Sequence, residues 1–561
     1  TVRIASKALT LVWNESNLLP LNPKDHVFRF AVGNCDTAIT SITSVMSDRI
    51  SAADKVVIDL YAYCNPTSTK NYGASPSVLS VISKVVSLNP KTAVVIFGSP
   101  YILQYFAAPR SPLASALPSP ASVVVAYQDL PEVRKAVERA LWGKTKFEGV
   151  LPVNVKSLQG KEQTKPIKKP SPYAKVVAAG MDSNCFRRID SIVNNGINQK
   201  AYPGCQVLVA YKGNVVYNRS FGRQTYDENS PLVDSSTIYD LASLTKVTAT
   251  TFAVMKLVDE GKIQLDDPLS RYLPYLKRTN KKSITVRQTL SHIARLKAFD
   301  AYYTKVDSRC GNLSHSKEEH DNTLCEECQT AMLLNIAKSD LVKETKYLYS
   351  DLGFILLADM VRQVSGQTLD VFMHQHFYQP MGLKNTTFCP RLQGFDTNRI
   401  APTEIDNYYR HRLLRGEVHD QNAAAMGGVS GHAGLFSTAS DIYQLYKMWL
   451  DGGKYNGKQI LSPAIFKTFN QRYYANLGNR RSLGYDKPFI NSRSTHCAPE
   501  ATQSSFGHTG FTGTMVWVDP DKELVYIFLS NRVYPDAGTN KLAKLNIRTD
   551  IQSLIYQSIK K

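Results

Sequence analysis

The sequence predicts two domains of mixed helix and strand, joined by a short basic linker. In residues 1–158, short apolar strands alternate with helical stretches, which is typical of a mainly parallel sheet covered on both faces. Residues 159–180 are rich in proline and lysine without apolar periodicity, so we expect an extended, solvated connector. Residues 181–561 combine a strand hairpin, several helices and a late strand pair, which predicts a second and larger domain.

The first domain contains three apolar runs of strand length, at residues 55–61, 92–98 and 122–127. Helical patterns lie between and after them, at 78–88 and 131–142. Fully apolar strands separated by helices predict an α/β sandwich, but such a fold indicates no function by itself.

The second domain begins with a predicted helix at 186–194 and two strands at 204–210 and 215–218. A Lys-Gly-Asn turn joins the two strands as a hairpin. Two further strands, 513–518 and 524–529, meet at an Asp-Pro-Asp turn near the C-terminus.

Between these strand pairs, the stretch 240–246 (Asp-Leu-Ala-Ser-Leu-Thr-Lys) leads into an apolar helical pattern that Gly261 ends. Ser243 and Lys246 are three residues apart at the start of this helix, so they lie on one side of it. A buried lysine with a lowered pKa can take the proton of a serine, and free backbone N–H groups at a helix start can face an oxyanion. Ser-x-x-Lys is common by chance, and an ordinary surface helix is the alternative.

Two later motifs support the catalytic interpretation. Tyr349-Ser350-Asp351 precedes an apolar helix at 352–358, and His508-Thr509-Gly510 lies beside the strand at 513–518. A serine with a lysine, then a tyrosine motif, then a strand-borne (His/Lys)-Thr-Gly, in this order, resembles the penicillin-recognising serine hydrolases. That superfamily contains class C β-lactamases, D-alanyl-D-alanine carboxypeptidases and related esterases. The resemblance implies an α+β fold of the β-lactamase/transpeptidase type for residues 181–561.

The resemblance also implies a role for each motif residue. Ser243 is expected to be the nucleophile, while Lys246 and Tyr349 share the role of base and proton relay. The backbone N–H groups of Ser243 and Phe511 are expected to form the oxyanion hole. The substrate and oxyanion side of the site comprises Thr509, Gly510 and Phe511.

The sequence departs from the family pattern at three places. Asp351 stands where asparagine is usual, and Ile293-Ala294-Arg295 replaces Thr-Ser-Gly after His292. His508 replaces the lysine of the common third motif, so a permanent cation becomes a group that gains its proton only below about pH 6.5. This change disfavours efficient β-lactam hydrolysis and favours an esterase or a peptidase that acts on D-amino-acid-containing wall fragments.

The first domain carries a second resemblance. The stretch 8–21 (Ala-Leu-Thr-Leu-Val-Trp-Asn-Glu-Ser-Asn-Leu-Leu-Pro-Leu) resembles the opening of the α/β-sandwich domain of family 3 glycoside hydrolases, and 147–153 resembles its end. In that family the sandwich follows a catalytic TIM barrel, which is missing before Thr1. The resemblance therefore implies the C-terminal part of a larger fusion of the β-N-acetylglucosaminidase type, and we assign no glycosidase residues here.

Residues 303–330 form a polar insertion, expected at the rim of the site, that holds part of the cysteine content. The chain has nine cysteines in all. Three interpretations of this segment stay open: no link, one disulfide, or a zinc site. The spacing matches no standard zinc motif, so we expect no metal and no cofactor. The cluster in question consists of Cys310, His315, His320, Cys325 and Cys328.

Two histidine stretches, 418–420 and 431–434, are either part of the pocket lining or structural.

Composition indicates a globular protein, with 43% hydrophobic and 20% charged residues and a formal net charge of +20. The basic residues are dispersed apart from one cluster at 165–170, and no nucleic-acid-binding motif accompanies them, so we expect no nucleic-acid partner. An anionic cell-wall surface is an alternative use of this charge. No apolar run is long enough for a transmembrane helix, and no signal peptide is visible. By the family resemblance we expect a periplasmic or extracellular location in a bacterial envelope.

We therefore predict a serine hydrolase that forms an acyl-enzyme on an ester or a D-amino-acid peptide, coupled to peptidoglycan or glycan breakdown. Its expected partners are a small-molecule or cell-wall peptide or glycan substrate and the missing N-terminal barrel. One alternative is a non-catalytic β-lactamase-fold module that supports a glycosidase; another is glycosidase activity in the full-length parent only. The survival of serine, lysine and tyrosine favours the catalytic interpretation over a decayed site.

Overall fold

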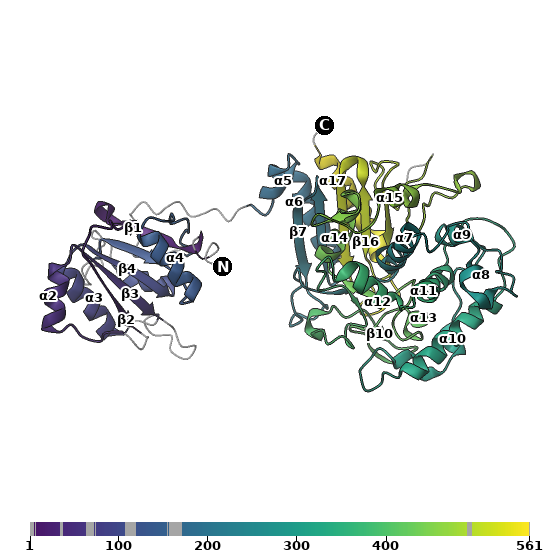
Figure 1. Cartoon of the computed structure of the whole chain (residues 1–561), viewed down its shortest axis with the longest axis horizontal. Helices are drawn as coiled ribbons and strands as arrows, with labels where there is room; N and C mark the ends of the chain where they lie inside the picture. The colour runs from purple at the N-terminus through teal and green to yellow at the C-terminus, as the bar shows by residue number, and fades with distance from the viewer. Residues whose placement is uncertain are drawn as a thin grey trace. The chain divides into compact units, whose positions relative to one another are not determined.

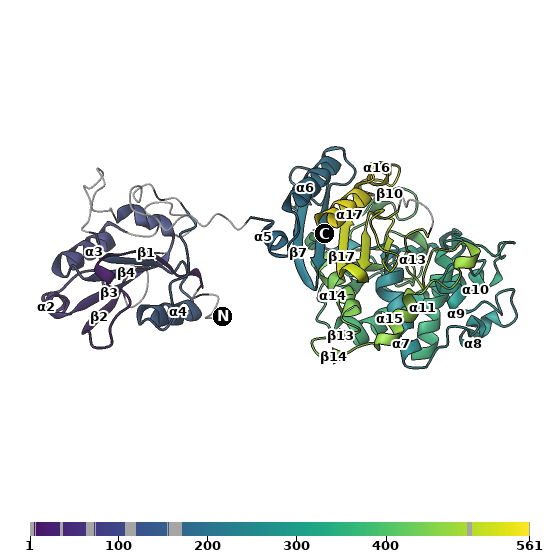
Figure 2. The same cartoon turned by 90° about the horizontal axis from the view of Figure 1, so that it is seen from above.

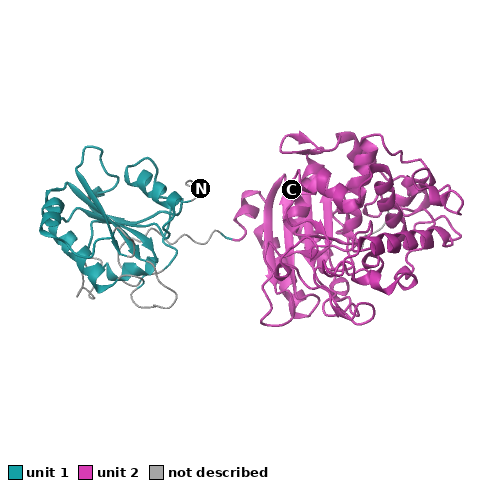
Figure 3. Cartoon of the chain, turned by 60° about the horizontal axis from the view of Figure 1, so that its bottom comes forward, with its two compact units in different colours: residues 1–171 teal, residues 172–561 magenta. Residues whose placement is uncertain are grey.

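The computed structural model places two compact units, residues 1–171 and 172–561, each with its own cores (Figure 3). Most of the predicted linker lies outside the described part of the chain, and its extended form stays a prediction. The structure describes residues 5, 7–33, 38–62, 72, 75–106, 119–153, 155, 171–490 and 496–559.

The first unit is built on a five-stranded sheet in the order β1-β5-β4-β3-β2. Neighbouring strands from β2 to β5 run parallel, whereas β1 pairs antiparallel with β5 at one edge. The strands are β1 (Thr10–Asn14), β2 (Val27–Gly33), β3 (Lys55–Ala62), β4 (Thr92–Gly98) and β5 (Ser122–Val125). The helices are α2 (Ser44–Ala52), α3 (Pro76–Leu88) and α4 (Pro131–Leu141), with short 3-10 turns at Glu15–Asn17 and Pro100–Tyr105.

Side chains of the central strands alternate between two cores because successive residues of a strand point to opposite faces. Ile58 and Val94 pack in the core that holds Ile82 of α3, while Val57 belongs to the core that holds Val137 of α4. Helices therefore cover both faces of a mostly parallel sheet, as the sequence predicts. The antiparallel strand β1 makes the sheet mixed.

The second unit is built on a fully antiparallel sheet in the order β15-β16-β17-β6-β7. Helices α6 and α17 lie side by side over one face, and the larger helical part of the domain covers the other face (Figures 1 and 2). These elements are β6 (Gly204–Tyr211), β7 (Asn214–Gly222), β15 (Phe506–Thr509), β16 (Met515–Asp519), β17 (Leu524–Ser530), α6 (Ser183–Asn198) and α17 (Ile547–Ser558).

Strand β17 shows how this sheet separates the two cores. Its residues Val525 and Ile527 face the helical core that contains Phe252. The intervening Tyr526 and Phe528 face the core under α6 and α17. All seven residues of β17 are buried, which explains why its sequence is almost entirely apolar, with Ser530 at its end.

The helical part surrounds the catalytic motifs with short elements and irregular loops. Its helices of eight or more residues are α7 (Thr251–Asp259), α10 (Asn322–Lys338), α11 (Asp351–Ser365), α14 (Ala439–Leu450) and α15 (Pro463–Asn470). Its shorter α-helices are α8 (Leu269–Tyr272), α9 (Val286–Leu290), α12 (Leu369–Met373) and α13 (Gln421–Ala424). The short helices α5 (Ala174–Ala178) and α16 (Lys541–Lys544) belong instead to the core that contains α6 and α17. Two π-helical turns span Lys246–Thr250 and His374–Tyr378.

The remaining elements of this unit are shorter still. Single 3-10 turns span Pro274–Leu276, Tyr302–Lys305, Ser308–Asn312, Thr397–Arg399, Ala475–Leu477 and Pro520–Lys522. Short strands are β8 (Tyr239–Asp240), β9 (Thr387–Phe388), β10 (Ile405–Asp406), β11 (Arg412–Leu413), β12 (Leu435–Ser437), β13 (Lys454–Tyr455) and β14 (Lys458–Gln459).

The cysteine–histidine cluster forms a disulfide, Cys310–Cys328. His315 Nδ1 lies 2.9 Å from a Glu417 carboxylate oxygen, and His320 Nδ1 lies 2.8 Å from the Leu313 carbonyl. The two imidazoles thus have partners other than the cysteines. No group of side chains suited to a metal ion occurs among the residues that the structure describes.

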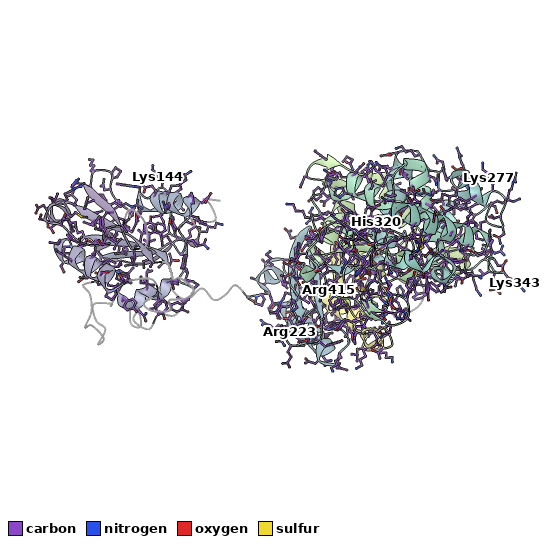
Figure 4. All side chains as sticks on the ribbon, turned by 90° about the horizontal axis from the view of Figure 1, so that it is seen from below. Lys144, Arg223, Lys277, His320, Lys343 and Arg415 are labelled. Atoms are coloured by element: carbon purple, nitrogen blue, oxygen red, sulfur yellow. A yellow bond between two sulfur atoms is a disulfide. The ribbon has the colours of Figure 1, made fainter. Side chains whose placement is uncertain are left out.

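The basic charge is spread over both units. Lys144 in the first unit and Lys277 and Lys343 in the second are exposed side chains on separate parts of the chain (Figure 4). None of the helices within the described ranges is long and apolar enough to cross a membrane.

Candidate active site

A tight turn presents Ser243 at the end of β8. Ala242 has a φ of +46°, and its N–H donates to Asp240 Oδ1 at 2.8 Å. A positive φ is costly for alanine, so surrounding contacts hold this turn. Ser243 follows immediately and is partly exposed, while its neighbours are buried.

The loop between β15 and β16 holds the turn from the other side. Thr512 Oγ1 donates to the Asp240 carbonyl at 2.7 Å, and Thr514 Oγ1 donates to the Leu241 carbonyl at 2.9 Å. A Cβ on Gly510 would lie 2.1 Å from Thr514 Oγ1 and 2.4 Å from the Leu241 carbonyl oxygen. Only glycine permits this close approach, so the predicted Thr-Gly motif places the sheet edge against the nucleophile turn.

Lys246 is fully buried at the centre of the site. Its Nζ donates to Ser243 Oγ at 2.9 Å and to the His432 carbonyl at 3.0 Å, and it lies 2.7 Å from Asp351 Oδ1. Two hydrogen bonds and one ion pair thus hold the ammonium group in place. Burial alone would lower the pKa of Lys246, but the charge of Asp351, with the added contacts to Asp351 and Tyr349, outweighs burial and raises this pKa. The expectation of a lowered lysine pKa is therefore wrong, because the residue at 351 is a carboxylate.

Tyr349 packs against this lysine. The Lys246 Nζ lies 5.0 Å from the centre of the Tyr349 ring. The buried Tyr349 hydroxyl has no hydrogen-bond partner among the described residues. Burial raises the pKa of Tyr349 although the Lys246 charge opposes this shift, so the side chain is a neutral phenol. An unpaired hydroxyl beside Lys246 is free to bond a reacting group.

His508 lies on β15 with its ring centre 5.7 Å from that of Tyr349. Its Nδ1 lies 2.7 Å from the Thr509 carbonyl, which requires a proton on Nδ1, and its buried Nε2 has no partner in the described part of the chain. Burial, then the charges of Arg481 and Lys246, lower the pKa of His508 well below its usual range. The imidazole thus stays neutral below pH 6.5, contrary to the expectation from sequence.

Arg481 is a buried cation that sequence reasoning missed. Its guanidinium carbon lies 5.2 Å from the centre of the Tyr349 ring, and its Nε donates to the Tyr347 hydroxyl at 3.1 Å. The Asp486 carboxylate lies 3.6 Å from it and raises its pKa against the effect of burial. No motif surrounds this arginine, so its position follows only from the folded chain. Arg295, which ends the Ile-Ala-Arg departure from the family pattern, donates from its Nε to the Val342 carbonyl at 2.8 Å.

The two backbone groups expected to bind an oxyanion are unoccupied. Neither the Ser243 N–H nor the Phe511 N–H donates a hydrogen bond to any residue that the structure describes. Arg532 Nε donates to the Phe511 carbonyl at 2.7 Å, and its guanidinium lies 4.4 Å from the centre of the Phe511 ring. This contact holds the Phe511 backbone next to the nucleophile turn.

Ser243 opens into a cleft of about 410 Å³. The aromatic side chains of Phe299, Tyr408 and Phe511 are among its walls and are 46%, 54% and 53% exposed. No lysine or arginine is among the described residues that line it. The lining consists of Ala242, Ser243, Phe299, Tyr349, Asp351, Tyr408, His419, Asp420, Gln421, His432, Ala433, Phe511 and Ala537.

Both histidine stretches contribute to this cleft, and each histidine also has a structural partner. His432 Nε2 lies 2.7 Å from Asp420 Oδ1, and His419 Nε2 lies 2.8 Å from Glu404 Oε2. The His419 ring stacks on Phe511 at 5.4 Å between ring centres. The sequence left open whether these histidines line the pocket or have structural roles. In the structure, His419 and His432 do both.

The structure thus brings Ser243, Lys246, Tyr349 and Asp351 together around one cleft. His508, Thr509 and Gly510 form the adjoining sheet edge, and Phe511 lines the cleft beside it. The family model described as Beta-lactamase matches residues 175–549, which is more than half of the chain. The chain belongs to the beta-lactamase family.

Two relatives of this beta-lactamase-family chain are named "Putative D-alanyl-D-alanine carboxypeptidase". The Escherichia coli K12 protein is 30% identical over 382 residues, which cover 63% of this chain and 84% of the relative. The Salmonella gallinarum protein is 31% identical over 389 residues, covering 65% of this chain and 86% of the relative. The structure also resembles EstCE1, a hydrolase with promiscuous acyltransferase activity, with a TM-score of 0.50 and 23% identity over 67% of this chain and all of that one. This similarity shows a shared fold and nothing more.

The beta-lactamase family assignment makes this chain a serine hydrolase, as its motifs predict. It also supports the β-lactamase/transpeptidase-like fold expected for the second unit. The matched segment begins at residue 175, so it does not include the mixed-sheet domain of residues 1–171.

Proposed function

We propose that the second domain hydrolyses an ester or a D-amino-acid peptide through an acyl-enzyme formed on Ser243. The observation that carries this proposal is the contact of Ser243 Oγ with Lys246 Nζ at 2.9 Å, on a turn that opens into the cleft. The unoccupied N–H groups of Ser243 and Phe511 support acyl chemistry because such donors stabilise a tetrahedral oxyanion. The names of the two relatives favour D-alanyl peptides as substrates.

In this mechanism the Lys246–Asp351 pair acts as the base. The resting ammonium cannot accept a proton, because its nitrogen has no free lone pair until it gives up a proton. Lys246 Nζ passes one proton to Asp351 Oδ1, at 2.7 Å, and takes the Ser243 proton in the same event. The pair thereby gains the serine proton and one positive charge, which balances the negative charge that develops on the oxyanion in the buried site.

Bond formation and cleavage then follow from these positions. Ser243 Oγ attacks the carbonyl carbon, and the two backbone N–H groups stabilise the oxyanion. When the intermediate collapses, the bond to the leaving group breaks and the leaving group takes a proton from Lys246 Nζ or from the Tyr349 hydroxyl. The proton on Asp351 then moves to Lys246, which restores the resting ammonium and carboxylate. Water then cleaves the acyl-serine bond by the same steps in reverse.

The cleft favours esters and peptides over β-lactams. Classical β-lactams carry a carboxylate, which is attracted by a fixed positive charge. His508 stays neutral because its pKa is lowered well below its usual range. Since no lysine or arginine lines the described cleft, the wild type is expected to hydrolyse penicillins slowly.

The experiment that tests this proposal is intact-mass analysis after incubation with a fluorophosphonate. One adduct should form on Ser243, and Ser243→Ala should prevent it, whereas Ser87→Ala on an exposed face of α3 should label normally. Labelling that persists in Ser243→Ala would refute the assignment of the nucleophile. A fully folded wild type that never labels would favour the non-catalytic alternative.

We further propose that the protein belongs to a bacterial envelope, where the first domain accompanies a family 3 glycosidase barrel. The Cys310–Cys328 disulfide supports an oxidising compartment. The mixed α/β sheet of the first unit is compatible with the sandwich that its sequence resembles. Co-sedimentation with purified peptidoglycan tests the envelope location, and we expect binding that persists in 0.5 M salt. Binding that disappears in 0.5 M salt would show only a general attraction of the positively charged protein to an anionic polymer.

A further inference from the structure

One residue that lines the cleft is a carboxylate with an oxygen that no described residue uses. Asp420 caps the short helix α13, and its Oδ1 accepts from the Ala423 N–H at 2.8 Å. The same oxygen lies 2.7 Å from His432 Nε2. Its Oδ2 makes no hydrogen bond to any described residue, although Asp420 lines the cleft and its side chain is 23% exposed.

This carboxylate is ionised throughout the working pH range. Burial would raise the pKa of Asp420, but the charge and hydrogen bond of His432, the Ala423 N–H and the charge of Lys246 lower it well below its usual range. An ionised oxygen that faces a cleft without a protein partner is costly unless a ligand or water satisfies it. The group it accepts best is a charged N–H donor.

The rest of the cleft agrees with a cationic ligand. The charge of Lys246 also reaches Asp420, but this lysine is buried and engaged with Asp351. Glu404, behind His419, adds another carboxylate, whose pKa is lowered by the His419 hydrogen bond against burial. The exposed rings of Tyr408 and Phe299 can attract an ammonium through their faces.

We propose that Asp420 selects substrates that carry a positively charged ammonium group, and that free carboxylates are disfavoured in this cleft. This inference rests on the proposed function and makes it more specific. The favoured substrate is an aminoacyl ester or amide with a free amino group, whereas a carboxypeptidase substrate would place its carboxylate near Asp420. The specificity of the site then differs from the activity in the names of its relatives.

Binding can be measured separately from chemistry in the full chain carrying Ser243→Ala. Calorimetry at low salt would compare three ligands that differ only at nitrogen: D-alaninamide (ammonium), N-acetyl-D-alaninamide (neutral) and N-succinyl-D-alaninamide (carboxylate). The ammonium ligand should bind about 10- to 100-fold more tightly than the neutral one, as expected for a charge-assisted hydrogen bond. The carboxylate ligand should bind most weakly.

The variant that isolates the charge is Asp420→Asn, which keeps an oxygen for the Ala423 N–H. It should reduce the ammonium-to-neutral affinity ratio to about one, while Asp521→Asn in an exposed turn should leave the ratio as it is. A ratio unchanged in Asp420→Asn, tightest binding of the carboxylate ligand, or no binding of D-alaninamide at millimolar concentration would each overturn the inference. Fluorophosphonate labelling of Ser243 tests the proposed function without involving Asp420. Normal labelling with no preference for the ammonium ligand would therefore refute only the role of Asp420, whereas loss of labelling would refute the proposed function itself.

Discussion

Lys246 Nζ lies 2.7 Å from Asp351 Oδ1, and this ion pair determines how the site holds its protons. The lysine side chain is fully buried and that of Asp351 is 19% exposed, so the attraction is only weakly screened. A Ser-x-x-Lys site with asparagine at position 351 would favour a neutral amine. Here the resting state is an ammonium, and the carboxylate is part of the base.

Asp351→Asn is expected to change the shape of the pH profile for acylation. The wild-type pair provides its base without net deprotonation, so kcat/KM should be flat between pH 7 and 9. Without the carboxylate the pKa of Lys246 loses the effect that raises it, and burial then lowers this pKa. Activity should fall at pH 7 by one to three orders of magnitude and rise with pH, as measured with p-nitrophenyl acetate. Superimposable profiles would show that Asp351 takes no part in proton transfer.

We expect the second domain to lose stability in mild acid, because two of its imidazoles are buried. Burial lowers the pKa of both His292 and His508 well below the usual value, with Arg481 and Lys246 adding to the shift. Below about pH 6.5 the unfolded chain binds two protons that the folded chain does not, so stability falls as pH falls. Between pH 6 and 5 the free energy of unfolding should drop by about 2 kcal/mol, before carboxylates titrate.

Urea denaturation of the second domain at pH 5, 6 and 7.5 measures this slope. His508→Asn keeps a donor for the Thr509 carbonyl but cannot titrate, so it should halve the slope. The preference for a neutral over a carboxylate ester should stay constant between pH 5.5 and 8, because His508 remains neutral. An unchanged slope in His508→Asn would contradict the assignment.

Gly510→Ala should damage both stability and catalysis. The added Cβ would lie 2.1 Å from Thr514 Oγ1 and 2.4 Å from the Leu241 carbonyl oxygen, so the backbone must move. We expect a loss of about 1–3 kcal/mol and at least a tenfold lower kcat/KM, because Leu241 belongs to the turn that positions Ser243. In Gly538→Ala the nearest atom is the end of the flexible Asp536 side chain, at 2.8 Å, so that variant is the matched control. Equal effects of the two substitutions would contradict the proposed role of Gly510.

The Cys310–Cys328 disulfide should stabilise the insertion measurably. It closes a loop with a sequence separation of 18, for which the chain-entropy estimate is about 3 kcal/mol. A Cys310→Ser/Cys328→Ser double variant should unfold at lower urea concentration than the wild type. Dithiothreitol should lower the stability of the wild type but leave that of the double variant unchanged. Cys325→Ser removes a free thiol of the same segment and serves as control. Stability equal to the wild type in the double variant would refute this contribution.

Much of the fold could be predicted because its strands and helices are strongly apolar or strongly periodic. The pattern at 352–358 corresponds to α11, and the pair at 513–518 and 524–529 corresponds to β16 and β17. The antiparallel pairing of β1 with β5 was not predicted, since the paired residues are more than 100 positions apart and no local pattern encodes it.

The site shows the same division between local and non-local information. Ser243, Lys246 and Tyr349 were found because their spacing and order form motifs. The pKa of Lys246 depends on the Asp351 carboxylate and on burial, which motif spacing does not report. Arg481 reaches Tyr349 from a loop without a recognisable pattern, so only the folded chain reveals it. The free Oδ2 of Asp420 likewise depends on how α13 and His432 meet.

The strand order of the second domain has a consequence for biosynthesis. The late strand β17 lies between β16 and the early strand β6, and the loop after β15 holds the turn that carries Ser243. A ribosome therefore releases the nucleophile, the lysine and the tyrosine long before the sheet that organises them can close. We therefore expect nascent chains to be inert as hydrolases until synthesis has passed β17 and α17.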